Sequence, residues 1–120
     1  MAHNEKNISD AVEMADCPVK LLKLEKKEVY ILFERIYFMD LGGYVNDFSI
    51  FIKSDFPISV IINEEDFCME DTNTLNVDII QSVSVSDENL TLGGFIKTGA
   101  WVEIFVKKYK FLLNEMRDKN

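Results

Sequence analysis

Apolar and polar residues alternate along much of the chain after Gly43, which is the period of a β-strand. Phe48, Ile50 and Ile52 form one such set, and Val83 and Val85 alternate with serines in another. The alternation continues from Trp101 to Leu113, with one parity rich in aromatic residues and the other aliphatic. Val, Ile, Tyr and Phe are favoured in strands, so the pattern predicts a mainly β protein.

Turn-forming residues separate these segments at short intervals. Turns are predicted at Gly42-Gly43, Asp55-Phe56-Pro57, Asp87-Glu88-Asn89 and Thr98-Gly99, and Gly93-Gly94 predicts a bulge or bend. Short connections between consecutive strands are typical of antiparallel meanders. We therefore predict an antiparallel meander of about six or seven strands, arranged as a sheet, a sandwich or a small barrel.

The segment Val19–Met39 is compatible with two structures. As a strand it would be apolar on both faces, with the cover ending at Glu34 and Arg35. Some of its apolar residues also have helical spacing, and Gly42-Gly43 would suit a helix C-terminus. We interpret the segment as one long strand, and a helix within residues 19–41, which would make the fold α+β, is the alternative.

The chain of 120 residues fits one domain with a real core. We expect a polar N-terminal arm over residues 1–18, a single β-rich domain over 19–114 and a polar C-terminal tail over 115–120. A short helix over Ser9–Ala15 is an alternative for the arm. The polar stretch Asn63–Asn76 is too long for a tight hairpin loop and predicts a surface excursion or a short helix.

The sequence predicts a cytoplasmic protein that does not enter the membrane. It has no apolar run of about eighteen residues, and its N-terminus lacks the basic and apolar parts of a signal peptide. Cys17 and Cys68 are the only cysteines. They form no CxxC pair, so we expect reduced, structural thiols.

Catalytic chemistry has little support in the residue types present. His3 is the only histidine and lies in the polar arm, which excludes a nucleophilic triad within the fold. The acids of Asn63–Asn73 are adjacent rather than alternating and no glycine accompanies them, unlike a calcium loop. Neither glycine pair has the spacing of a phosphate loop. We therefore expect no enzyme activity, no metal and no cofactor.

Negative charge is concentrated in the middle of the chain, within an overall net charge of −8. Residues 41–96 contain ten acids and one base, Lys53. This balance disfavours nucleic-acid binding, which depends on Lys and Arg, and also anionic membranes. It favours a basic protein partner.

The strongest candidate site lies in the acidic loop after the predicted strand at 58–62. An acidic rim there would surround an apolar anchor, which is how charged interfaces combine steering with adhesion. The candidate residues are Glu64, Glu65, Asp66, Phe67, Met69, Glu70 and Asp71.

Three functions are compatible with these features. The first is a non-catalytic binding protein, such as a bacterial immunity or antitoxin protein that neutralises a basic, nuclease-like toxin domain. The second is a secretion chaperone or assembly subunit that offers a sheet edge or apolar groove to an unfolded segment. The third is a small-ligand-binding β-barrel whose cavity the aromatic residues would line.

Overall fold

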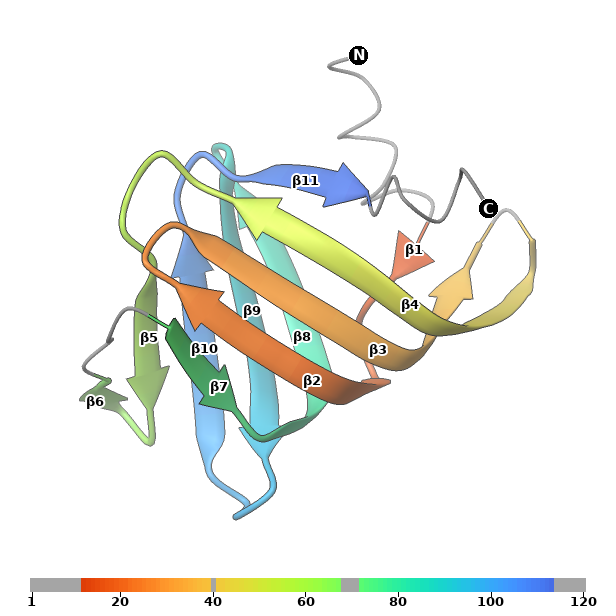
Figure 1. Cartoon of the computed structure of the whole chain (residues 1–120), viewed down its shortest axis with the longest axis horizontal. Helices are drawn as coiled ribbons and strands as arrows, with labels where there is room; N and C mark the ends of the chain where they lie inside the picture. Colours follow the sequence, from red (N-terminus) through yellow and green to blue (C-terminus); the bar gives the residue numbers. More distant parts are fainter. Residues whose placement is uncertain (1–11, 40, 68–71, 114–120) are drawn as a thin grey trace.

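The computed structural model describes residues 12–39, 41–67 and 72–113 (Figure 1). These residues form eleven strands joined by turns, and none of them is helical, so they include no helix able to cross a membrane. The strands are β1 (Val12–Glu13), β2 (Cys17–Glu25), β3 (Glu28–Phe38), β4 (Gly43–Lys53), β5 (Ser59–Ile62), β6 (Glu65–Asp66), β7 (Thr72–Leu75), β8 (Val77–Ser86), β9 (Asn89–Ile96), β10 (Trp101–Val106) and β11 (Lys110–Leu113).

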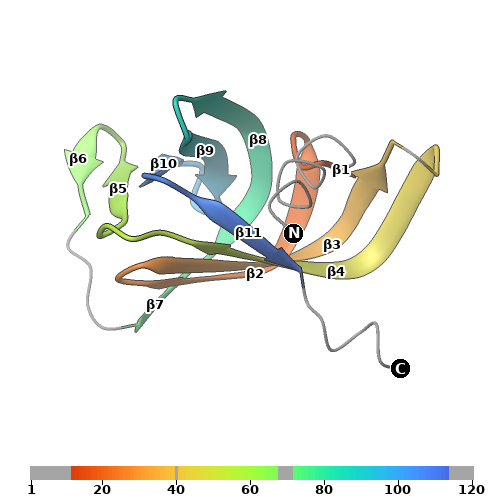
Figure 2. The ribbon, with the colours of Figure 1, turned by 90° about the horizontal axis from the view of Figure 1, so that it is seen from above.

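All strands belong to one antiparallel sheet, in the order β11-β4-β3-β2-β8-β9-β10-β5-β6, while β1 pairs with β3 and β7 with β2. The sheet folds over on itself, so that β2, β3, β4 and β11 lie across from β8, β9, β10 and β5 (Figure 2). The buried apolar side chains lie between these two halves. The predicted antiparallel β fold is confirmed, with eleven strands rather than six or seven and with a sheet that is not closed into a barrel.

The interpretation of Val19–Met39 as one long strand is wrong, and so is the helical alternative. The segment is a hairpin of β2 and β3 that turns at Lys26-Lys27. Leu22 and Leu24 before the turn and Val29 and Ile31 after it are all fully buried. Apolar alternation on both sides of a short polar turn is the pattern of two strands. Treating the whole segment as one apolar run conceals the turn between them.

The mixed periodicity of this segment has a structural cause at Glu34. Phe33 and Ile36 are both fully buried although they are three residues apart, because the inward-facing set changes parity between them. Asp47 of β4, which lies between the partners of Phe33 and Arg35, has a left-handed backbone with φ of 54°. Toward their connecting turn, β3 and β4 curve away from the rest of their half of the sheet (Figure 2).

The predicted strand Trp101–Leu113 is also two strands, which belong to different halves of the sheet. β10 pairs with β5 and β9, whereas β11 pairs with β4. Lys108 has a left-handed φ of 47° at the corner between them. The hydroxyl of Ser54 holds this corner, since it donates to the carbonyl of Lys107 at 2.5 Å and accepts from the amide of Phe56 at 2.9 Å.

The predicted turns are confirmed. Gly42 and Gly99 have left-handed φ values of 64° and 97° at their hairpins, and Asp87 and Glu88 form the two-residue connection of β8 and β9. The register of β8 slips by one residue beside Gly93-Gly94, which is the expected bulge.

Two predicted irregular segments fall partly on residues that are not described. In the stretch Asn63–Asn76 the described residues form a turn, the strands β6 and β7 and two residues without regular structure, and none of them is helical. Residues 68–71 lie outside the described ranges. Of the arm over residues 1–18, only 12–18 are described. They comprise β1, a turn at Ala15-Asp16 and the first residues of β2, with no helical turn.

Candidate protein-interaction site

The acidic residues at 64–66 lie on a hairpin that joins β5 to β6. Ile62 pairs with Glu65, which leaves Asn63 and Glu64 as a two-residue connection. Both have left-handed backbones, with φ of 51° and 69°. Two such residues in a two-residue loop are the signature of a type I′ turn, whose twist matches that of the flanking strands. Glu64, Glu65 and Asp66 are all exposed on this turn.

Asn63 fastens the turn to the first residue of β10. Its amide donates to the carbonyl of Trp101 at 2.9 Å. Its side-chain oxygen accepts from the amide of Trp101 at 3.2 Å. These two hydrogen bonds fix the acidic turn beside Trp101, so the carboxylates project from a defined backbone rather than from a loose loop.

The carboxylates of this turn are not neutralised by ion pairs within the described residues. The ion pairs there join Lys20 to Asp47 and Arg35 to Glu34, all remote in sequence from the β5–β6 turn. Three adjacent acids that make no ion pair with another described residue produce a local negative potential, which attracts a positively charged surface.

The apolar residues predicted as anchors are placed differently. Phe67 is half-buried and packs against the core, and its amide donates to the carbonyl of Val60 at 2.9 Å. Phe67 therefore packs on the core side of the β5–β6 hairpin. Met69, Glu70 and Asp71 lie outside the described residues.

Glu103, which is not among the predicted site residues, lies in one row across neighbouring strands with Asp66 of the acidic hairpin. Asp66 pairs with Ile61, Ile61 pairs with Glu103, and Glu103 pairs with Gly93. Residues paired in this way project from the same face of a sheet. Strands are about 4.8 Å apart, so Asp66 and Glu103 are separated by roughly 10 Å across the outer face, with Ile61 between them.

Aromatic side chains lie beside this row. The rings of Trp101 and Phe95 pack edge to face, with centroids 5.0 Å apart. Trp101 is half-buried, and Phe95 keeps 39% of its surface exposed. Trp and other aromatic residues are the usual anchors of protein interfaces. The acidic residues therefore lie next to the aromatic pair of Trp101 and Phe95, which is not the apolar anchor that was predicted.

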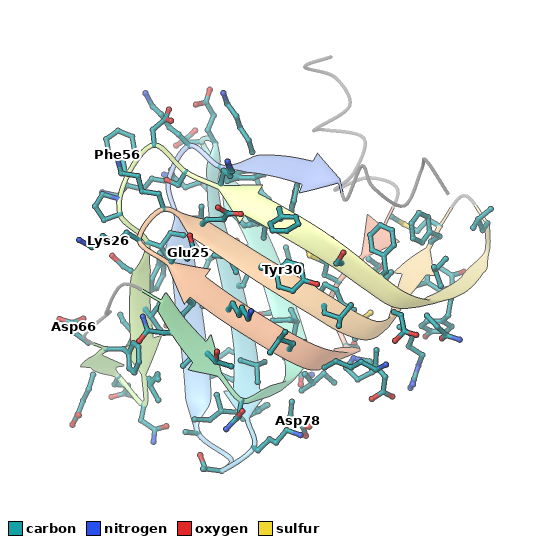
Figure 3. The ribbon with its side chains drawn as sticks, viewed as in Figure 1. Glu25, Lys26, Tyr30, Phe56, Asp66 and Asp78 are labelled. Carbon is teal, nitrogen blue, oxygen red and sulfur yellow. The ribbon has the colours of Figure 1, made fainter. Side chains whose placement is uncertain are left out.

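The described acids of residues 41–96 do not gather on one face. Asp66 and Asp78 are at separate places on the molecule (Figure 3). Asp47 is paired with Lys20, and Asp87 and Glu88 lie near the far end of β10, where the amide of Tyr109 donates to the carbonyl of Glu88. The turn at 63–66 is thus one acidic site among several.

The described residues offer little reactive chemistry. No three of their His, Cys, Asp and Glu side chains gather closely enough to hold a metal ion. Burial raises the pKa of Cys17, whose thiol donates to the carbonyl of Glu13 at 3.1 Å. A neutral, buried thiol is a poor nucleophile. The ligand-binding alternative assumed a closed barrel, and the open sheet does not provide one.

The chain matches no protein-family model, no curated protein and no solved structure. Its site is therefore interpreted from its own geometry. That geometry combines a fixed acidic turn, a second carboxylate on the same face and an aromatic pair beside them.

Proposed function

We propose that this protein is a non-catalytic binding module that docks its acidic β5–β6 turn on a basic protein. The observation that carries the proposal is the exposure of Glu64, Glu65 and Asp66 on a turn that Asn63 fastens to Trp101. A turn already held in one conformation loses little entropy when it binds. Complementary charge then accelerates the encounter and selects the partner.

An immunity or antitoxin role fits this description best. Nucleases bind phosphates through Lys and Arg, so their active sites are basic. An acidic protein that covers such a site competes directly with the nucleic acid. The net charge of −8 adds long-range attraction to a cationic partner.

Charge reversal at the turn tests this function. The double variant Glu64→Lys/Glu65→Lys reverses two charges on the β5–β6 turn. The matched control, Asp87→Lys/Glu88→Lys, makes the same change in net charge in the two-residue turn near the opposite end of β10. Affinity capture with the wild-type protein supplies a partner, which is then purified for calorimetry and assayed for nuclease activity.

We expect a basic partner whose nuclease activity the wild-type protein inhibits. Binding should weaken at high salt, fall at least about tenfold in the Glu64→Lys/Glu65→Lys variant, and change much less in the control. Equal losses in the two variants would indicate a general charge effect. Equal affinity of the site variant and the wild type would contradict the proposal.

One observation favours a second candidate, the chaperone or assembly subunit. β11 pairs only with residues 50–53 of β4, and no strand among the described residues covers the outer edge of residues 43–49. Leu41 and Tyr44 beside this edge are 71% and 62% exposed. An extended segment could add to such an edge through backbone hydrogen bonds. Binding by this route should be insensitive to salt and abolished by Val45→Pro.

A further inference from the structure

Glu103 has an unusual position on the outer face of the sheet. Its neighbours in the row are Ile61 on β5 and Gly93 on β9. The indole of Trp101 covers Gly93, since a Cβ atom at Gly93 would lie 2.5 Å from Cζ2 and 3.0 Å from Cη2 of that ring. The hydroxyl oxygen of Ser82 lies there as well, 2.7 Å from the same Cβ position. In its row Glu103 is thus flanked by Ile61 on one side and by the Trp101 ring with the Ser82 hydroxyl on the other.

Glu103 is half-buried, and it makes no ion pair within the described residues. Apolar neighbours reduce the access of water to a charge, which strengthens its attraction to a cation that reaches it. Asp66, roughly 10 Å away in the same row, adds negative potential at the open end. The face therefore has the charge and shape to receive a positively charged side chain that lies along the row.

Arginine fits this row better than lysine. Its guanidinium is planar, forms two parallel hydrogen bonds with a carboxylate and stacks on an aromatic face, and it is weakly hydrated. Its methylene stem can cover Ile61 while the charged end reaches Glu103 and Trp101. Lysine carries a compact, strongly hydrated charge that cannot pair in this bidentate manner.

We infer that the outer face of β5, β10 and β9 recognises an arginine side chain of the basic partner, through Glu103 and the indole of Trp101. The inference rests on the proposed function and specifies the chemistry of the contact. The acidic turn attracts the partner, and the Glu103 row selects arginine over lysine.

The single tryptophan of the chain makes this testable without the partner. Its fluorescence is recorded during titration with acetylated, amidated peptides of five arginines, five lysines or five citrullines. We expect saturable quenching or a spectral shift with the arginine peptide, affinity for the lysine peptide weaker by about threefold or more, and no response to the neutral citrulline peptide.

Two isosteric variants make the test specific. Glu103→Gln should reduce the preference for arginine over lysine to nearly one. The control Glu28→Gln changes a half-buried glutamate on β3, in the other half of the sheet, and should leave the preference unchanged. Thermal unfolding of both variants verifies that they are folded at the temperature of the titration.

The outcomes separate this inference from the proposed function. Equal affinities for the arginine and lysine peptides, or equal effects of the two glutamine variants, would overturn the arginine site. If the purified partner is lost on charge reversal of the turn but binds Glu103→Gln like the wild type, the docking function stands and the arginine site does not. A partner that binds the turn variant normally contradicts the function itself.

Discussion

The indole of Trp101 lies over the backbone of Gly93 on the neighbouring strand. A Cβ atom at Gly93 would come within 2.5 Å of Cζ2 of the ring, closer than van der Waals contact allows. Gly94 is restricted in a different way, because its Cβ would lie 2.3 Å from the carbonyl oxygen of Ile79, a backbone atom in the bulged part of β8. Gly93 thus leaves space for the side chains of Trp101 and Ser82, and Gly94 leaves space for the backbone of β8.

Alanine substitutions should therefore have distinct consequences at these two glycines. Gly93→Ala should lower the free energy of unfolding by about 1–3 kcal/mol, since the indole must tilt away from its position. Gly94→Ala should cost more, because the backbone of β8 must shift. Urea unfolding gives both values.

A double-mutant cycle identifies the cause at Gly93. Adding Trp101→Ala to Gly93→Ala should recover about 1 kcal/mol relative to additivity, because the nearer obstruction, the indole ring, is gone and only the Ser82 hydroxyl remains close to the new Cβ atom. The same addition to Gly94→Ala should show little coupling. Additive effects in the first pair would contradict the steric explanation.

The two type I′ turns predict stabilising substitutions. Glu64 and Glu88 occupy equivalent second positions of two-residue turns, with φ of 69° and 68°. A left-handed backbone is unfavourable for a residue with a Cβ atom and free of this cost for glycine. Glu64→Gly and Glu88→Gly should each raise the unfolding free energy by about 0.5–1 kcal/mol, as measured by denaturant titration.

These turn variants also separate stability from binding. Glu64→Gly should weaken the binding of the basic partner although the protein becomes more stable, because it removes a carboxylate from the docking turn. Glu88→Gly serves as the control, with the same gain in stability and nearly unchanged affinity. Loss of stability in both variants would show that the glutamate side chains support these turns.

Alkaline pH should destabilise the outer face of β2, β3 and β4 through Lys20. The hydrogen bond from the Lys20 ammonium to Asp47 raises the pKa of Lys20 above its ordinary value of 10.5. The charged form is favoured in the folded state, so its contribution is complete below pH 10.5 and is lost as the pH rises through the folded pKa. Lys20→Met should lose less stability than the wild type above this pH.

That comparison is made by thermal unfolding at a series of pH values, with Lys23→Met as the control. Lys23 is an exposed lysine on the same strand, and no ion pair within the described residues involves it. Identical pH profiles for Lys20→Met and the wild type would contradict a folded-state role of the ion pair.

Strands and turns were readable from the sequence because alternation and turn chemistry are local. Asp87-Glu88 and Gly93-Gly94 were placed correctly on that basis. The parity change at Glu34 was not, because it depends on the matching left-handed residue Asp47 on another strand. The division of Trp101–Leu113 was hidden for a similar reason, since Ser54 fixes the corner at Lys107 from a distant loop.

The candidate site was likewise predictable only where it depends on local sequence. The exposed acids at Glu64, Glu65 and Asp66 follow from a polar, acidic stretch between strands. Their neighbours do not, because the pairing of β5 with β10 joins segments about forty residues apart. Trp101 and Glu103 share one parity in the sequence, which was the available sign that they face the same way. Only the register shows that Asp66 lies in their neighbourhood.

Cys17 provides a final prediction on the inner face of β2. Its side chain is buried, and desolvation raises the pKa of the thiol above its ordinary value of 9.0. The neutral thiol is favoured in the folded state, so this contribution is complete below pH 9.0 and is lost as the pH rises through the folded pKa.

In a Cys68→Ser background, iodoacetamide should modify native Cys17 far more slowly than the unfolded chain, because the thiolate is the reactive form. The rate, followed by mass spectrometry, should rise with urea in parallel with unfolding and should remain low up to about pH 9. Modification of native Cys17 at the rate of the unfolded chain would show that β1 and the turn at Ala15-Asp16 open readily, and that burial of the thiol does not protect it.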